Sequence, residues 1–449
     1  MRRISRVGLA AAAWVAASLL ACGGGEAERP RNLVLVSLDT LRADHLGLQG
    51  YARDTSPELD RWAQQAFVFE NALAPANATV ASHHALFQSR TAGAALARRD
   101  AAPTLAAILQ AHGFHTVAWT GGGTMSRAAG FARGFDVWDE GNDGLAQSVP
   151  KALRFLDEAA REDRRFYLFV HAFDAHLPYD PPPPFDTRYD PDYHGKVTGP
   201  ATLPLLRGVR RIFEQAHAAQ PPQLDAADRT KIEALYDGEI AHADALLAKL
   251  LSRLAAPDLE AETLVVILSD HGEEFWDHGS VLHAHTLYQE LLHVPLLVRV
   301  PALAPRARRI EARVSLLDVV PTLLELLAVA PPPGLQGRSL VPLLEGAAMP
   351  PRPLFAEGFA FDAKLQAVVD GNWKAIRSQG TQALALYDLA ADPGEQRDVA
   401  AARPADRDRL KALLDTGLGG APAPADPLAM PGHIDAATQQ RLRALGYVD

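Results

Sequence analysis

The feature that most constrains the fold of this chain is a set of short, almost uninterrupted apolar runs. Residues 32–38, 166–170 and 263–268 contain hardly any polar side chain. A strand that is apolar along its whole length is buried on both faces, which is typical of parallel sheets covered by helices. Helical periodicity at 103–112 and 226–254 alternates with these runs. The sequence therefore predicts an α/β fold, a doubly wound, mostly parallel sheet flanked by helices. Further strands are predicted at 116–119 and 294–300, and further helices at 80–87, 149–160 and 316–327.

The pattern of apolar and polar residues changes after about residue 350. Short strand-like runs and a late helix at 436–445 replace the long alternation of the preceding part. We expect a main domain at 32–345 and a small α+β subdomain at 350–449. The short strands are predicted at 366–369, 373–376 and 386–389.

Two stretches lack regular patterning. Residues 181–222 begin with four prolines and are predicted as an insertion loop. The Ala/Pro-rich residues 419–431 are predicted as a link before the last helix.

The first 31 residues indicate export. Arginines precede a short apolar run, so residues 1–21 resemble a signal peptide, and the run is too short to span a membrane. Leu19-Leu20-Ala21-Cys22 resembles a bacterial lipobox, in which the cysteine carries lipid. We expect an exported protein, periplasmic or on the outer face, lipid-anchored at Cys22, with residues 22–31 as a tether. The alternative is an ordinary signal peptide in which the cysteine is incidental.

Cysteine content and charge narrow the classes of site and partner. Cys22 is the only cysteine, which excludes an internal disulfide and a multi-thiolate metal site. The net charge is −10, and no cluster of Lys and Arg lies outside the extreme N-terminus. We therefore expect no nucleic-acid partner, and membrane contact only through the lipid anchor.

Polar, chemically capable side chains follow three of the predicted strands. In a doubly wound sheet, ligands bind beyond the carboxyl ends of the strands, so these side chains are the first candidates for a site. A single acid in such a place is commonly a helix cap, but three strand ends together favour a site. The residues are Asp39 and Thr40 after the first run, His171, Asp174 and His176 after the second, and Asp270 and His271 after the third.

These residues and their surroundings resemble the sulfatase family, which belongs to the alkaline phosphatase superfamily. The resemblance implies an alkaline phosphatase-like fold and metal-dependent hydrolysis of an ester. The matching segments are 32–50, 55–66, 77–87, 270–299, 315–344, 386–389 with 392–395, and 441–447.

The resemblance assigns roles to individual residues. Asp39 matches the first metal-binding Asp of the family, and the pair Asp270 and His271 matches a second metal-binding pair. Thr40 stands where many members have another Asp. His176 resembles a histidine that contacts substrate, and His283 one that contacts the leaving group or a second metal. His278 is a weaker candidate, which we weigh against a loop histidine that is satisfied locally.

The nucleophile segment departs from the family pattern. Members carry Cys or Ser in Cys-x-Pro-Ser-Arg, and that first residue is oxidised to formylglycine. Here the matching segment is Thr79-Val80-Ala81-Ser82-His83, and oxidation of a Thr would give a ketone instead of an aldehyde. We therefore expect no formylglycine. His83 occupies the place of the motif Arg and is a further catalytic candidate.

Thr79 suggests a different nucleophile. A divalent cation beside its hydroxyl would lower the hydroxyl pKa and produce an alkoxide that attacks phosphorus or sulfur. Thr79 also precedes the helix predicted at 80–87, whose N-terminal amides favour an anionic ester. Phosphoester-hydrolysing and phosphoethanolamine-transferring relatives in the superfamily use a Thr in this way, so the resemblance favours phosphorus. The alternative is that Thr79 is a plain helix N-cap.

The ligand types bear on the metal. Asp39, Thr79, Asp270 and His271 offer two carboxylates, a hydroxyl and an imidazole, which suit Mn²⁺ or Zn²⁺ better than Ca²⁺, the alternative. We predict one divalent cation. A second is left open, because Asp174 is the only additional acid that we place nearby.

We predict a hydrolase of sulfate or phosphate esters, with a small-molecule, glycan or lipid ester as substrate. One alternative is a phosphoryl-alcohol transferase. The other is a catalytically inactive, sulfatase-like binding lipoprotein. Thr40, Ala81 and His83 favour this alternative, because each departs from the residue that the family has at that position. Residues 236–239 also look family-like, but we assign no chemistry to carboxylates in the middle of a helix.

Overall fold

The computed structural model describes residues 29–99, 101–142, 144–214, 224–359, 364–418 and 434–445. The predicted leader, Cys22, most of the tether and the predicted link at 419–431 lie outside these residues. Within them, no helix combines the length and the apolar character needed to cross a membrane.

A large sheet forms the centre of the described structure, and its order is β11-β2-β10-β6-β1-β5-β3-β4, with β9 also paired to β2. β1 lies between β5 and β6 and is parallel to both, whereas β10 is antiparallel to β6 and β2. The predicted mostly parallel sheet is therefore confirmed. Its strands are β1 (Asn32–Leu38), β2 (Phe67–Leu73), β3 (His115–Trp119), β4 (Val137–Asp139), β5 (Phe166–Ala172), β6 (Thr263–Leu268), β9 (His293–Val294), β10 (Leu296–Arg299) and β11 (Arg309–Ser315).

β1 shows why its sequence is apolar throughout. Successive side chains of a strand point to opposite faces. Leu33 and Leu35 belong to one buried apolar cluster, and Val34 and Val36 belong to another on the opposite face. Both faces of β1 are thus covered, as the uninterrupted apolar run predicts.

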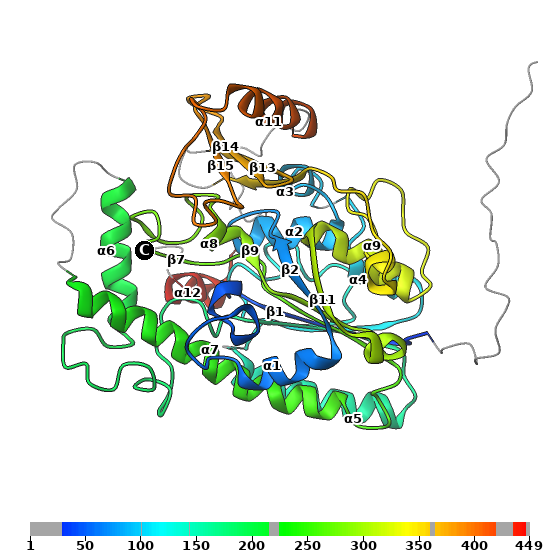
Figure 1. The fold of residues 1–449 in the computed structure, drawn as a ribbon. Coiled ribbons are helices and arrows are strands. Elements are labelled where there is room, and N and C mark those ends of the chain that lie inside the picture. The colour runs from blue at the N-terminus through cyan, green and yellow to red at the C-terminus, as the bar shows by residue number, and fades with distance from the viewer. Residues whose placement is uncertain are drawn as a thin grey trace, which may run out of the picture.

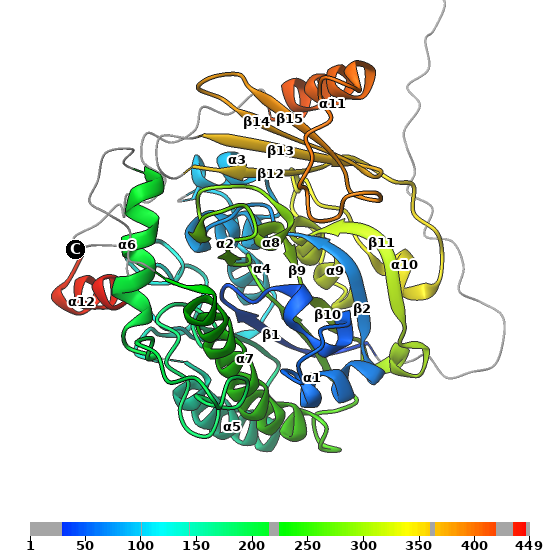
Figure 2. The same cartoon turned by 60° about the vertical axis from the view of Figure 1, so that its left-hand side comes forward.

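Helices cover the two faces of the sheet (Figures 1 and 2). α5 and α7 pack side by side on one face, and α2, α4 and α9 lie on the other. The helices are α1 (Pro57–Trp62), α2 (Thr79–Gln88), α3 (Ala92–Leu96), α4 (Leu105–Ala111), α5 (Leu145–Arg161), α6 (Thr202–Glu214), α7 (Ala226–Leu254), α8 (Gln289–Leu292), α9 (Val319–Leu326), α10 (Val341–Glu345), α11 (Pro404–Gly417) and α12 (Ala436–Ala444).

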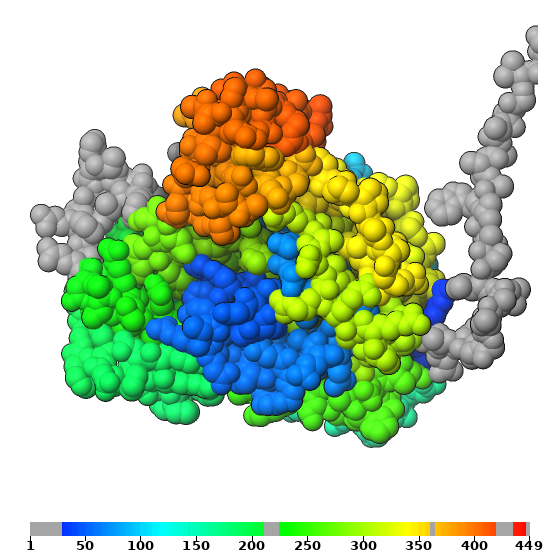
Figure 3. Space-filling model, viewed as in Figure 1, coloured from blue at the N-terminus to red at the C-terminus, as the bar shows by residue number. Residues whose placement is uncertain are grey.

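The C-terminal part forms a second, antiparallel sheet of order β12-β13-β14-β15. α11 packs on this sheet through a small apolar cluster that includes Leu410 and Leu414. In the space-filling view this part stands as a lobe on the main body (Figure 3). The strands are β12 (Leu354–Gly358), β13 (Leu365–Asp370), β14 (Trp373–Ser378) and β15 (Leu384–Asp388), and a separate hairpin pairs β7 (Glu274–Phe275) with β8 (Val281–Leu282).

Three differences from the sequence predictions have physical reasons. The predicted loop at 181–222 contains α6, in which Leu206 and Val209 are buried; Pro204 does not prevent this helix, because it lies in the first turn. The strand predicted at 294–300 is divided into β9 and β10 by Pro295, which has no amide hydrogen to donate to a ladder. β11 was not predicted, since its sequence is largely polar and much of it is exposed at the edge of the sheet.

Candidate functional site

The sheet brings two strand ends together at the candidate site. β1 and β6 are parallel neighbours in which Ser37 is paired with Leu268. The residues that follow, Asp39 after β1 and Asp270 with His271 after β6, therefore emerge at the same edge.

Asp39, Asp270 and His271 form a compact cluster of metal-ligating side chains. One ligand atom from each lies within 4.8 Å of the others, and all three residues are fully buried. Thr79 Oγ1 lies 3.2 Å from Asp39 Oδ2 and 3.4 Å from His271 Nε2. The structure thus brings the four residues proposed as ligands to one place.

The donor set of this cluster fits a divalent cation. Asp39 Oδ1 and both carboxyl oxygens of Asp270 are buried without a hydrogen-bond partner in the described structure. His271 Nδ1 lies 2.9 Å from the carbonyl of Gly272, to which it donates, so the lone pair of Nε2 faces the carboxylates. Buried carboxylates are costly unless they are paired or bind a metal. A cation would satisfy all of these atoms.

The electrostatics of the cluster also favour the charged forms of its carboxylates. Burial opposes ionisation, but His271 and His83 hold the pKa of Asp270 well below its ordinary value. For His271, burial alone would lower the pKa, and the charges of Asp270 and Asp39 outweigh it and raise the pKa. A positive charge is thus favoured beside the two carboxylates.

Thr79 is the first residue of α2 and therefore follows the N-cap position of that helix. Ala78 is the N-cap, no side-chain capping bond is present, and the Thr79 hydroxyl points to Asp39 instead. The alternative that Thr79 is a plain N-cap is therefore wrong.

His83 lies one turn along α2, behind the cluster. Its Nδ1 donates to the carbonyl of Thr79 at 3.0 Å and lies 3.3 Å from Asp270 Oδ2. Its Nε2 is 3.0 Å from Ser37 Oγ. The side chain is fully buried, so these contacts position Thr79 and Asp270.

His176 and His283 flank the cluster on its other side. Their ring centroids are 5.1 Å apart, and the ring of His283 lies 4.7 Å from that of His271. Burial, followed by the neighbouring His271 and His176, holds the pKa of His283 well below its ordinary value. His283 is therefore neutral at pH 7, and its Nδ1 donates to Glu273 Oε1 at 2.8 Å.

Two residues of the site, Glu273 and Tyr179, were missing from the predicted candidates, and His171 was named at a strand end without a role. Glu273 bonds to His283 and also accepts a hydrogen bond from Tyr179 at 2.7 Å, and burial raises its pKa to about 7. His171, the penultimate residue of β5, lies with Nε2 3.3 Å from Asp39 Oδ2. The sequence did carry a signal for Glu273, which follows Asp270-His271-Gly272 directly.

The expectation that Asp174 is the additional acid near the metal is wrong. Its carboxylate accepts from the backbone amide of Leu145 at the start of α5, and it is not part of the cluster. Thr40, in the place of a second Asp, donates its hydroxyl to the carbonyl of Ala175 at 2.8 Å. Its φ of 57° is an outlier for a β-branched residue, so this bond holds a strained turn beside Asp39.

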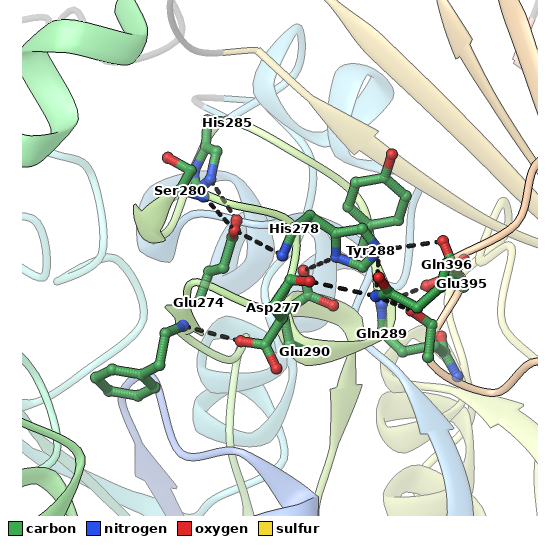
Figure 4. A network of polar contacts seen from close by, with 12 residues as sticks. Glu274, Asp277, His278, Ser280, His285, Tyr288, Gln289, Glu290, Glu395 and Gln396 are labelled. Carbon is green, nitrogen blue, oxygen red and sulfur yellow. Dashed lines mark hydrogen bonds and ion pairs between the residues drawn. The ribbon is translucent and has the colours of Figure 1, made fainter. Parts of the chain in front are cut away.

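His278 belongs to a polar network that joins the site segment to the C-terminal lobe (Figure 4). Its Nδ1 is 2.8 Å from Glu290 Oε1, and its ring stacks on Tyr288 at 3.5 Å between centroids. Glu395, from the C-terminal lobe, accepts a bond from the amide of Gln289 at 2.6 Å. These partners agree with the interpretation of His278 as a locally satisfied loop histidine.

Comparison with known proteins identifies the family. The sequence profile described as "Sulfatase" matches residues 31–329, about two thirds of the chain. The chain belongs to the sulfatase family. A second profile, for the C-terminal part of N-sulphoglucosamine sulphohydrolase, matches residues 277–416 of this sulfatase-family protein, across the joint between the main body and the lobe.

Curated relatives match this sulfatase-family protein over part of their length. It is 33% identical over 182 residues to arylsulfatase K of Xenopus laevis, covering 38% of this chain and 34% of that protein. It is 27% identical over 281 residues to the multifunctional alkaline phosphatase superfamily protein PehA of Trinickia caryophylli, covering 56% of this chain and 54% of that one. The chain thus spans about a third to a half of the length of these relatives.

Solved structures match nearly the whole fold. The phosphonate monoester hydrolase of Agrobacterium radiobacter gives a TM-score of 0.68 at 21% identity, covering 86% of this chain and 94% of that chain. BT4656, in complex with its substrate D-glucosamine-2-N,6-O-disulfate, gives 0.72 at 19% identity, covering 89% and 100%. At these identities the likeness shows the fold, and the predicted alkaline phosphatase-like fold is confirmed.

Proposed function

We propose that this protein is a metal-dependent hydrolase of phosphate or sulfate esters, with phosphate preferred and Thr79 Oγ1 as the nucleophile. The observation that carries the proposal is the position of Thr79 Oγ1, within 3.4 Å of both Asp39 and His271 in a buried cluster with unsatisfied carboxylate oxygens. The solved relatives include a phosphonate monoester hydrolase and a protein in complex with a disulfated glucosamine as its substrate, which supports an ester of either element.

The proposed reaction proceeds in two displacements. Thr79 Oγ1 loses its proton and bonds to the phosphorus or sulfur, the bond from that atom to the alcohol oxygen breaks, and the alcohol leaves with one proton. Water then attacks the esterified Thr79, phosphate or sulfate leaves, and a proton returns to Oγ1. The first residue of a helix suits this step, because the N-terminal amides of α2 favour the anionic group.

The chain's own residues have distinct roles in this proposal. Asp39, Thr79, Asp270 and His271 hold one divalent cation, with Mn²⁺ or Zn²⁺ favoured over Ca²⁺ because an imidazole is among the ligands. When bound, such a cation supplies Lewis-acid chemistry at the hydroxyl and at the ester. His83 positions Thr79 from behind through its bond to the Thr79 carbonyl.

The remaining two histidines act on the substrate side. His176 donates through Nδ1 to the carbonyl of Leu177 at 2.7 Å, which orients its Nε2 lone pair. His283 is oriented in the same way by Glu273. Both lie where charge develops on the transferred group and on the leaving oxygen, and there they stabilise it.

The test measures bound metal together with hydrolysis of nitrophenyl phosphate, bis-nitrophenyl phosphate and nitrophenyl sulfate. Thr79→Ala should abolish turnover, Thr79→Ser should retain part of it, and Thr230→Ala, an exposed change on α7, should match the wild type. Turnover that survives in Thr79→Ala would refute the nucleophile. A preference for the sulfate ester would refute the phosphate assignment, and absence of metal and turnover would favour the catalytically inactive binding protein.

We further propose, from the sequence alone, that the chain is exported and anchored by lipid at Cys22. Cells that express the full chain and are labelled with a radioactive fatty acid should incorporate label into the wild type and not into Cys22→Ala. The variant should leave the membrane fraction, because its anchor is lost. Labelling of Cys22→Ala would show that the cysteine is incidental.

A further inference from the structure

A cavity of about 350 Å³ opens beside the candidate active site and shares His176 with it. This volume is in the range of small-molecule sites. Its walls come from the loop after β5, from α5, from α7 and from α12. Leu177 and Leu445 supply apolar surface, and the cavity is large enough for the alcohol part of an ester whose reacting group lies at Thr79.

Glu239, on α7, is the most unusual wall residue of this cavity. It is only 7% exposed, and its Oε1 accepts a hydrogen bond from the backbone amide of Asp180 at 2.8 Å. Its second carboxyl oxygen is not among the buried unpartnered atoms of the described structure, so it is open to the space of the cavity. A mostly buried carboxyl group that reaches a cavity through one oxygen is stabilised when a proton or a cationic ligand binds there.

The charges around Glu239 are of its own sign. Burial first, and then the charges of Asp174 and Asp180, raise the pKa of Glu239 to about 9. Asp174 and Asp180 line the same cavity. Arg441, on α12, also lines the cavity, and burial lowers its pKa. Arg441 donates a hydrogen bond to the carbonyl of Asn142.

We propose that the Glu239 end of this cavity binds a cationic ammonium group on the alcohol part of the substrate, so that amine-bearing esters are preferred. The ammonium would lie close to Asp174, Asp180 and Glu239 and would donate a hydrogen bond to the second carboxyl oxygen of Glu239. As it binds, Glu239 releases its proton to solvent, because the ligand charge favours the ionised carboxylate. This inference rests on the proposed function, since it is His176 that joins the cavity to the reacting centre.

Binding of matched, non-hydrolysable anions tests the inference without turnover. Calorimetry on the full, metal-loaded chain compares 2-aminoethylphosphonate with propylphosphonate, and taurine with propane-1-sulfonate. The aminoalkyl member should bind about tenfold more tightly, the scale expected for a partly buried charge pair. Glu239→Gln should reduce the ratio to about twofold or less. Glu233→Gln, a half-buried acid on the same helix that does not line the cavity, should keep it.

The outcomes separate this inference from the proposed function. Equal binding of both members of a pair by the wild type overturns the ammonium site. An unchanged ratio in Glu239→Gln, with a melting temperature at pH 7 no lower than that of the wild type, overturns it as well. Thr79-dependent hydrolysis of nitrophenyl phosphate without an ammonium preference would leave the proposed function standing alone. An ammonium preference that depends on Glu239, without Thr79-dependent hydrolysis, would support the site and refute the nucleophile.

Discussion

Replacing Glu395 by Gln should strongly destabilise the joint between the main body and the C-terminal lobe. Lys374 and Glu395 are both fully buried, and Lys374 Nζ lies 2.8 Å from Glu395 Oε1 and 3.0 Å from Oε2. Burial lowers the pKa of Lys374, and the carboxylate of Glu395 offsets this effect. Without Glu395, the ammonium would keep the weak contact to Gln289 Oε1, at 3.4 Å, and the more distant charge of Glu290.

The expected magnitude follows from this geometry. Removing one partner of a buried ion pair costs about 3–5 kcal/mol, because the other charge is left buried and uncompensated. Combining Lys374→Met with Glu395→Gln should restore part of the loss, since no charge then remains buried. The matched control is Asp370→Asn, which breaks the exposed pair of Asp370 with Arg409 in the same lobe and should cost about 0–1 kcal/mol.

Urea unfolding followed by circular dichroism gives the free-energy differences for the transition that includes the C-terminal sheet. If Glu395→Gln costs no more than Asp370→Asn, the buried pair does not hold the lobe and the reasoning is refuted. The same conclusion follows if the double variant is less stable than Glu395→Gln alone.

Three further predictions concern the site and its cavity. Asp270→Asn should lower metal affinity by at least about a hundredfold, measured as metal content after dialysis, because it removes a proposed ligand; full retention of metal would contradict the site. His171→Gln should lower metal affinity by about 10–100-fold, since Nε2 of His171 orients Asp39, and an unchanged affinity in competition with a chelator would exclude that role. The pKa of Glu239 in the folded protein, about 9, exceeds the ordinary value of 4.5. Between these two pH values the folded state holds a proton on Glu239 that the unfolded state has lost. The stability of the wild type therefore falls as pH rises through this window. Glu239→Gln lacks this slope, so its melting temperature should rise relative to the wild type between pH 5 and pH 9, whereas the exposed change Glu158→Gln should follow the wild type.

Much of the fold was predictable because local pattern and tertiary environment agree. β1, β6 and α7 have the boundaries that the sequence predicts, since both faces of the strands are buried and the helix is long and well capped by Asp225. α6 and β11 were missed for opposite reasons. Prolines around α6 resemble loop punctuation, and β11 is an edge strand that derives its regularity from pairing with β2.

The candidate site was predictable where residues follow strand ends. Asp39, Asp270 and His271 could be named because the carboxyl ends of parallel strands meet at one edge. Glu273 was not named, and His171 was named at a strand end but given no role. Whether a carboxylate or imidazole faces the cluster depends on the turn after a strand, and sequence spacing does not encode that direction.

The sequence by itself determined the sheet class, the position of Thr79 in the segment that resembles the family's nucleophile motif, and the candidate ligands at strand ends. It could do so because apolar runs and short motifs act locally along the chain. Only the tertiary structure decided which acidic side chains lie in the cluster and which line the cavity. Asp174 turned out to face the amide of Leu145, and Glu239, in the middle of a helix, turned out to line a cavity beside His176. Burial, the sign of neighbouring charges and the direction of a side chain arise from contacts between segments distant in sequence, so they exist only once the chain has folded.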